Sequence, residues 1–172
     1  YCFTTTALTS KIWLIYEDEN GEWQGKAVAD IGDPAKVPLP VDISITSDDQ
    51  GLWVNTFMDG NARYFDISDP FNPVQKYGEE IGGQVNMISQ SWDGKRAYFS
   101  TSLLGNWDKD SNGEMQWVKL YEWDDEKLEL SHKWTVDFYK EKLGRAHQMR
   151  FGAYSLYSSK TDNKKEVTLL DK

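Results

Sequence analysis

The chain contains an internal repeat with a period of 44 to 45 residues. Two segments each read as a strand, a Ser-x-Asp turn and a second strand: Asp42–Thr56 and Met87–Thr101. The offset is 44 positions from Ser47 to Ser91 and 45 positions from Val54 to Phe99. Four-stranded β-propeller blades occupy roughly 40 to 50 residues. The repeat therefore predicts an all-β fold built from propeller blades, each a four-stranded antiparallel sheet.

Residues within the repeat alternate between two faces, as a strand requires. Leu52 and Val54 share one face of the predicted strand, whereas Trp53 and Asn55 share the other. Aromatic residues make up 14% of the chain, which also favours sheet because their side chains suit a pleated, half-buried surface. A third strand is predicted in each unit, and its three copies indicate about three blades: 11–16, 61–67 and 115–123.

The first of these blades is entered partway. Residues 1–7 already read as an inner strand, so the opening strand of that blade is missing and the set of blades is incomplete on its own. We expect blades over residues 1–157 and a polar tail over 158–172, in which 166–170 suits a last short strand. Helix is confined to one short candidate at 138–143, which Gly144 closes.

Charge and composition exclude several classes of partner and site. The net charge is −9, and the 19 Lys and Arg residues form no run dense enough to follow a phosphate backbone, so nucleic acid is excluded as a partner. No apolar stretch approaches the roughly 20 residues that span a bilayer. The single cysteine, Cys2, excludes an internal disulfide or a cysteine-built metal site within this chain, and we expect it to be a small buried strand residue.

Only two histidines are present, so this chain alone cannot provide a three-histidine metal site. His132 falls in the alternating stretch 128–136 and is predicted to be a strand residue that faces solvent. His147 follows Gly144 in a loop, where its residue type leaves a structural role and a metal-ligand role both open. A sugar-processing propeller would need paired carboxylates, but the candidates lie at turn positions and read as structural: Asp66, Asp69 and Asp137.

Several motifs occur together in one order along the chain. They are LPVDISITSDD at 39–49, GNARYFDISDP at 60–70, DGKRAYFSTSL at 93–103, VDF at 136–138 and LGRAHQM at 143–149. In these motifs the chain resembles the selenium-binding protein family, which includes the bacterial methanethiol oxidases. The resemblance covers most of residues 1–157, but only the C-terminal part of the family's chain.

The resemblance implies a seven-bladed propeller, of which this chain would form about three blades. It implies copper as the cofactor and the conversion of a small thiol with oxygen and water to an aldehyde, hydrogen sulfide and hydrogen peroxide. The histidine of the family's Ala-His motif matches His147, which the resemblance makes a copper ligand. The family's reactive cysteine lies in the missing N-terminal portion, and Cys2 does not match it.

The resemblance also implies a partner and leaves other properties open. The N-terminal portion of the propeller would be supplied by the same gene product or by a separate chain. A non-enzymatic propeller that binds selenium, thiols or other proteins is the alternative function, since one fold hosts many functions. A bacterial oxidase of this kind would be periplasmic, with the cytoplasm as the alternative, and a homo-oligomer remains open.

Overall fold

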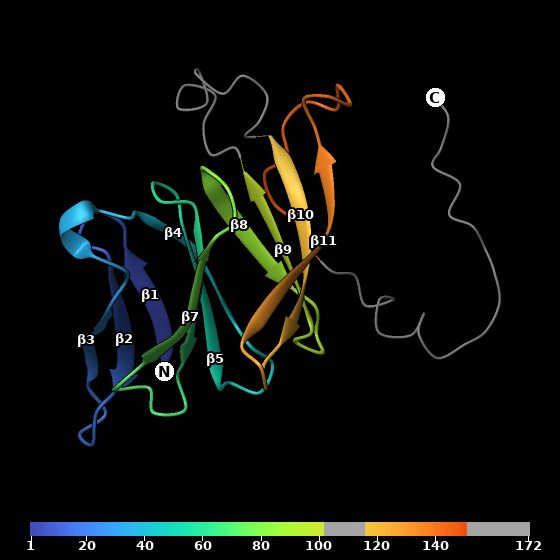
Figure 1. The fold of residues 1–172 in the computed structure, drawn as a ribbon. Coiled ribbons are helices and arrows are strands. Elements are labelled where there is room, and N and C mark those ends of the chain that lie inside the picture. Colours follow the sequence, from blue (N-terminus) through green and yellow to red (C-terminus); the bar gives the residue numbers. More distant parts are fainter. Residues whose placement is uncertain (102–115, 151–172) are drawn as a thin grey trace.

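Three antiparallel β-sheets make up the part of the chain that the computed structural model describes, residues 1–101 and 116–150. Their strand orders are β1-β2-β3, β4-β5-β6-β7 and β8-β9-β10-β11, and Figure 1 shows the three sheets side by side in chain order. The first sheet contains β1 (Cys2–Thr6), β2 (Lys11–Glu17) and β3 (Trp23–Asp30). The second contains β4 (Pro40–Ile45), β5 (Gly51–Thr56), β6 (Asn61–Asp66) and β7 (Val74–Glu80). The third contains β8 (Val85–Gln90), β9 (Arg96–Thr101), β10 (Trp117–Asp124) and β11 (Glu129–Asp137).

This architecture confirms the predicted all-β fold with four-stranded units and a first unit that has three strands. The predicted polar tail at 158–172 lies outside the described residues, so its last strand stays a prediction. No helix in the described ranges is long and apolar enough to cross a membrane.

The second sheet is covered on both faces, which explains why its central strand β5 is buried throughout. Leu52 and Val54 pack toward the first sheet, in an apolar cluster with Phe3, Ile12 and Leu14. Trp53, which lies between them in sequence, points the other way, since successive strand side chains alternate. It joins a second cluster with the third sheet, whose large members are Trp53, Phe99, Trp117, Tyr121 and Trp123.

The turn between the first two strands of each repeat corrects the sequence alignment. Thr46 Oγ1 donates to Asp48 Oδ1 over 2.6 Å, and its hydroxyl accepts a bond from the Gly51 backbone N–H over 2.8 Å. Ser91 plays the same part in the third sheet, where its hydroxyl bonds Asp93 and accepts from the Arg96 N–H. The structural counterpart of Ser91 is therefore Thr46 rather than Ser47.

Short helical segments were the weakest part of the sequence prediction. The stretch 138–143 forms hydrogen-bonded turns instead of the predicted helix, because Leu143 N donates back to Phe138 O over 2.9 Å and the Phe138 N–H bonds to Gln116 O. The described helix is a single 3-10 turn at Pro34–Lys36, where the Asp33 side chain accepts from Ala35 N.

The first strands of the second and third sheets, β4 and β8, are linked by side chains. Asp42 Oδ2 accepts a hydrogen bond from the Ile88 backbone N–H over 2.9 Å. Further along the pair, Gln90 Nε2 donates to Ser44 Oγ over 2.6 Å and to Ile45 O over 2.7 Å. These bonds fix the two sheets against each other at their innermost strands, where the candidate site lies.

Candidate functional site around His147

The segment 144–150 carries the sequence-predicted ligand and lies against the third sheet. Ser100 Oγ on β9 donates a 2.7 Å hydrogen bond to the backbone carbonyl of His147. Two residues further along the chain, Met149 borders an apolar groove with Tyr98 and Trp134. Tyr98 and Ser100 share a face of β9, opposite to the face on which Phe99 packs toward the second sheet. The segment therefore crosses the face of the third sheet that the second sheet does not cover.

The imidazole of His147 is exposed but is held at one nitrogen. Its Nδ1 lies 3.4 Å from the side-chain Nδ2 of Asn86 on β8, whose own side chain is fully buried. The backbone bond from Ser100 and the amide contact from Asn86 thus act on the same residue from two neighbouring strands. A loop histidine held in this way is pre-oriented, which lowers the entropy cost of binding a ligand.

A carboxylate from the second sheet lies within electrostatic reach of this ring. Burial raises the pKa of Asp42, although hydrogen bonds from the backbone N–H groups of Ile88 and Ile43 and the charge of His147 each favour its ionised form. The site therefore draws on β4, β8, β9 and the segment after β11, and it lies where the second and third sheets meet.

The residues near His147 fit one ligand of a metal site, but they do not make a complete set. Within residues 1–101 and 116–150, no three His, Cys, Asp or Glu side chains lie close enough together to hold a metal ion. An exposed imidazole suits copper by its donor type. A complete ligand set would therefore need residues from outside this part of the chain.

The other histidine and the cysteine lie elsewhere. His132 is an exposed residue of β11, as predicted, and its Nε2 lies 2.8 Å from Thr135 Oγ1 while its ring packs edge-on against Tyr121. The prediction that Cys2 is buried is wrong. Phe3 takes the core-facing position of β1, so Cys2 points to the opposite face and is exposed.

The carboxylates considered for sugar chemistry are turn caps, as their sequence positions suggested. Asp66 Oδ1 accepts from the Ser68 N–H over 3.0 Å, and Asp69 Oδ1 accepts from the Phe71 N–H over 2.9 Å. Asp137 caps the turn after β11 by accepting from the Lys140 N–H over 2.9 Å. Each carboxylate therefore has a local structural role.

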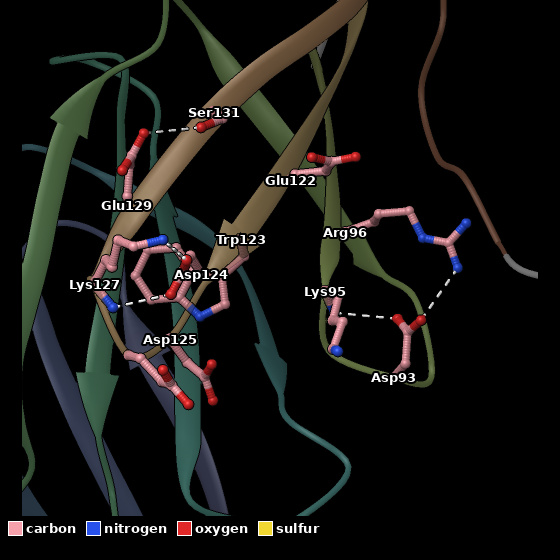
Figure 2. Close-up of a pocket in the computed structure, with 11 residues that line it drawn as sticks. Asp93, Lys95, Arg96, Glu122, Trp123, Asp124, Asp125, Lys127, Glu129 and Ser131 are labelled. Atoms are coloured by element: carbon pink, nitrogen blue, oxygen red, sulfur yellow. Dashed lines mark hydrogen bonds and ion pairs between the residues drawn. The ribbon is translucent and has the colours of Figure 1, made fainter.

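A larger hollow of about 730 Å³ lies at the turns of the third sheet, and sequence reasoning did not single it out. Figure 2 shows charged side chains around it, including the pairs Lys127 with Asp124 and Arg96 with Asp93. These charges satisfy one another or cap turns, since Asp93 also accepts from the Lys95 N–H. The hollow therefore presents a solvated rim of paired charges, and its Ser131 hydroxyl donates to Glu129 Oε1 over 3.1 Å on the exposed side of β11.

Asn86 is the site residue that sequence reasoning missed. Its signal was available in the repeat, because the equivalent position 45 residues earlier is Val41, an apolar residue. A polar residue in place of an apolar one at a buried repeat position indicates a specific partner, since burying an amide is unfavourable without a hydrogen bond.

Sheets packed face to face with their first strands adjacent define the molecule as part of a β-propeller. The β-propeller domain of Swd1 from Myceliophteria thermophila matches 74% of the chain with a TM-score of 0.54 at 12% identity, which supports the fold alone. A hypothetical selenium-binding protein from Sulfolobus tokodaii matches 77% of this chain and 36% of its own with a TM-score of 0.66 at 28% identity.

Residues 1–158 match the family model described as 56 kDa selenium binding protein, SBP56, and the chain belongs to this family. Among its relatives is a methanethiol oxidase from Ruegeria pomeroyi, which is 64% identical over 159 residues. That match covers 92% of this chain and 36% of the relative, so the chain spans about a third of the length of the protein it resembles.

Proposed function

We propose that this chain forms part of a copper-dependent thiol oxidase and supplies His147 as one of the copper ligands. The high identity to a methanethiol oxidase over nearly the whole chain supports the activity. The contacts of His147 support its assignment as a ligand, because β8 and β9 contact its ring and its backbone while the residue stays exposed. This second observation carries the assignment of the residue.

The proposed reaction converts a small thiol, oxygen and water to an aldehyde, hydrogen sulfide and hydrogen peroxide. For methanethiol, one molecule each of thiol, oxygen and water gives one molecule each of formaldehyde, hydrogen sulfide and hydrogen peroxide. The thiol carbon is oxidised and its bond to sulfur breaks, while oxygen is reduced by two electrons. Copper, when bound, supplies redox chemistry with oxygen that unaided side chains lack. His147 contributes a neutral imidazole lone pair, and the rest of the propeller contributes the remaining ligands and the thiol site.

The test uses a chimera in which this chain replaces the matching segment of the Ruegeria pomeroyi relative. We expect His147→Ala to lose copper and to stop producing hydrogen sulfide and hydrogen peroxide from methanethiol, while the far-UV circular dichroism stays the same. The control is His132→Ala, which removes an exposed strand histidine that bonds only locally. Full copper content and turnover in the His147→Ala chimera would overturn the assignment.

A second candidate is a propeller that binds selenium or thiols without turning them over. The match to a family described as selenium binding, and the likeness to a solved protein described in the same way, favour it. This function predicts a chimera that binds its ligand without copper and consumes no oxygen with methanethiol. Oxygen uptake by the copper-loaded chimera separates the two candidates directly.

A further inference from the structure

The first strands of the second and third sheets carry the same irregularity. In β4 the ladder with β5 shifts register between Pro40 and Asp42, so that Val41 is the extra residue. In β8 the ladder with β9 shifts between Val85 and Met87, and the extra residue is Asn86. A bulge of this kind turns the extra side chain out of the regular alternation, and bulges recur beside functional sites.

The two bulges differ in the side chain that they turn. In β4 an aliphatic side chain fills the position, so the bulge itself does not require an amide. In β8 the amide is fully buried and lies 3.4 Å from the ring nitrogen of His147. Burying an amide is unfavourable unless it is hydrogen-bonded. The contact with His147 gives this amide a polar partner that the valine of the β4 bulge does not need.

A carboxamide can serve either state of the ring. In this structure Nδ2 faces Nδ1, the orientation in which the amide donates to an unprotonated Nδ1. Turned by half a rotation, the amide presents Oδ1 in the same space and accepts from Nδ1–H. When Nδ1 carries the proton, the lone pair of the neutral imidazole is on Nε2. A metal-bound histidine is normally held in this way by an acceptor behind it, which sets the tautomer and the direction of the ring.

We propose that Asn86, with its amide turned so that Oδ1 accepts from Nδ1–H, is a positioning residue for His147 and selects the tautomer and ring direction that offer Nε2 as the coordinating nitrogen. Ser100 completes the hold through the backbone carbonyl of His147. The role in metal binding rests on the proposed function, but the orientation of the ring belongs to the protein without metal. The β8 bulge thus places the Asn86 side chain where it orients the His147 ring.

The experiment compares Asn86→Val with Asn86→Asp in the same full-length chimera. Asn86→Val installs the side chain that the β4 bulge already carries, so the fold is expected to tolerate it, and it removes the hydrogen bond to the ring. We expect its copper dissociation constant to rise at least about tenfold, in the range seen when partners of metal ligands are removed. Asn86→Asp retains an acceptor and should bind copper within about threefold of the parent. The control Val41→Ala alters the equivalent bulge without touching His147.

A second readout needs no metal. In the copper-free chimera, the ¹⁵N shifts of the His147 ring should report one dominant tautomer in the parent and a mixture of both tautomers in Asn86→Val. Unchanged tautomer populations, or an unchanged copper dissociation constant in Asn86→Val when His147→Ala has lost copper, would overturn the role of Asn86. Retention of copper by His147→Ala would instead overturn the proposed ligand, while the tautomer measurement would still decide the positioning of the ring.

Discussion

At the scale of single residues, Trp53 shows what the repeat could and could not predict. The alternation around it placed its ring opposite to Leu52 and Val54, and the structure confirms this. The repeat also pairs Trp53 with Tyr98, which suggests equal burial, but Tyr98 is only half-buried because the face it occupies borders an open groove. Periodicity predicts the direction of a side chain, whereas burial depends on which neighbour covers the sheet.

Trp53→Ala is expected to cost about 3 to 5 kcal/mol in the free energy of unfolding, the range for deleting a large buried ring. The ring is 1% exposed and packs edge-on against Tyr64, Phe99 and Trp123 with centroids 4.8 to 6.0 Å apart. The matched control is Trp23→Ala, whose ring is 68% exposed. Urea midpoints of the two chimeric variants check this, and equal midpoints would contradict the packing.

At the scale of elements, most strands could be predicted from sequence because alternation and turn chemistry agree. The hydroxyl and carboxylate turns at Thr46 and Ser91 are local, so the sequence showed them, apart from a one-residue error in the first. The turn at 138–143 was mistaken for a helix because its first residue, Phe138, donates to the carbonyl of Gln116, which is distant in sequence. The bulges in β4 and β8 depend on pairing with the neighbouring strands, and alternation does not reveal them.

Gly60 connects two elements and provides a test at this scale. It adopts φ +63°, accepts a hydrogen bond from Ile81 N, and a Cβ added there would lie 2.3 Å from the backbone oxygen of Gly82. Gly60→Ala should therefore require the backbone to move and should destabilise clearly more than Gly94→Ala. Gly94 has φ +69° with open space around a Cβ, so its substitution should cost only the left-handed strain, about 1 to 2 kcal/mol. Equal unfolding free energies of the two variants would contradict the close approach at Gly60.

At the scale of the whole molecule, the first and third sheets each have a surface that no other strand or sheet covers in the described part of the chain. On one side, β1 pairs only with β2, so its other edge has no strand beside it there. On the other, an apolar groove of about 310 Å³ crosses the third sheet, with Tyr98, Trp134 and Met149 along it. Sequence could predict the open edge from the short first unit, but the groove required the packing of the segment after β11.

We expect further blades of the same ring to cover this groove, because the corresponding face of the second sheet, with Trp53 at its centre, is covered by the third sheet. The chain, a third of its relative's length, should then behave differently by itself and within the chimera. Alone, it should associate in a concentration-dependent way and be cut readily by protease, since exposed apolar patches and strand edges promote association. The chimera should unfold in one cooperative, protease-resistant transition.

Trp134→Lys tests whether a further blade covers the groove, because it should affect the isolated chain and the chimera differently. The ring is 50% exposed in this structure, so a lysine there places a charge on the open groove and should reduce association of the isolated chain, measured by sedimentation velocity. In the chimera the same lysine would be buried against the next blade and should lower the urea midpoint, because a buried unpaired charge is costly. The control Trp92→Lys replaces a ring that is 58% exposed and borders a different hollow, and it should leave the midpoint nearly unchanged. An unchanged urea midpoint of the Trp134→Lys chimera would show that this face has no blade beside it. The same conclusion would follow if the isolated chain were monomeric, folded cooperatively and resisted protease.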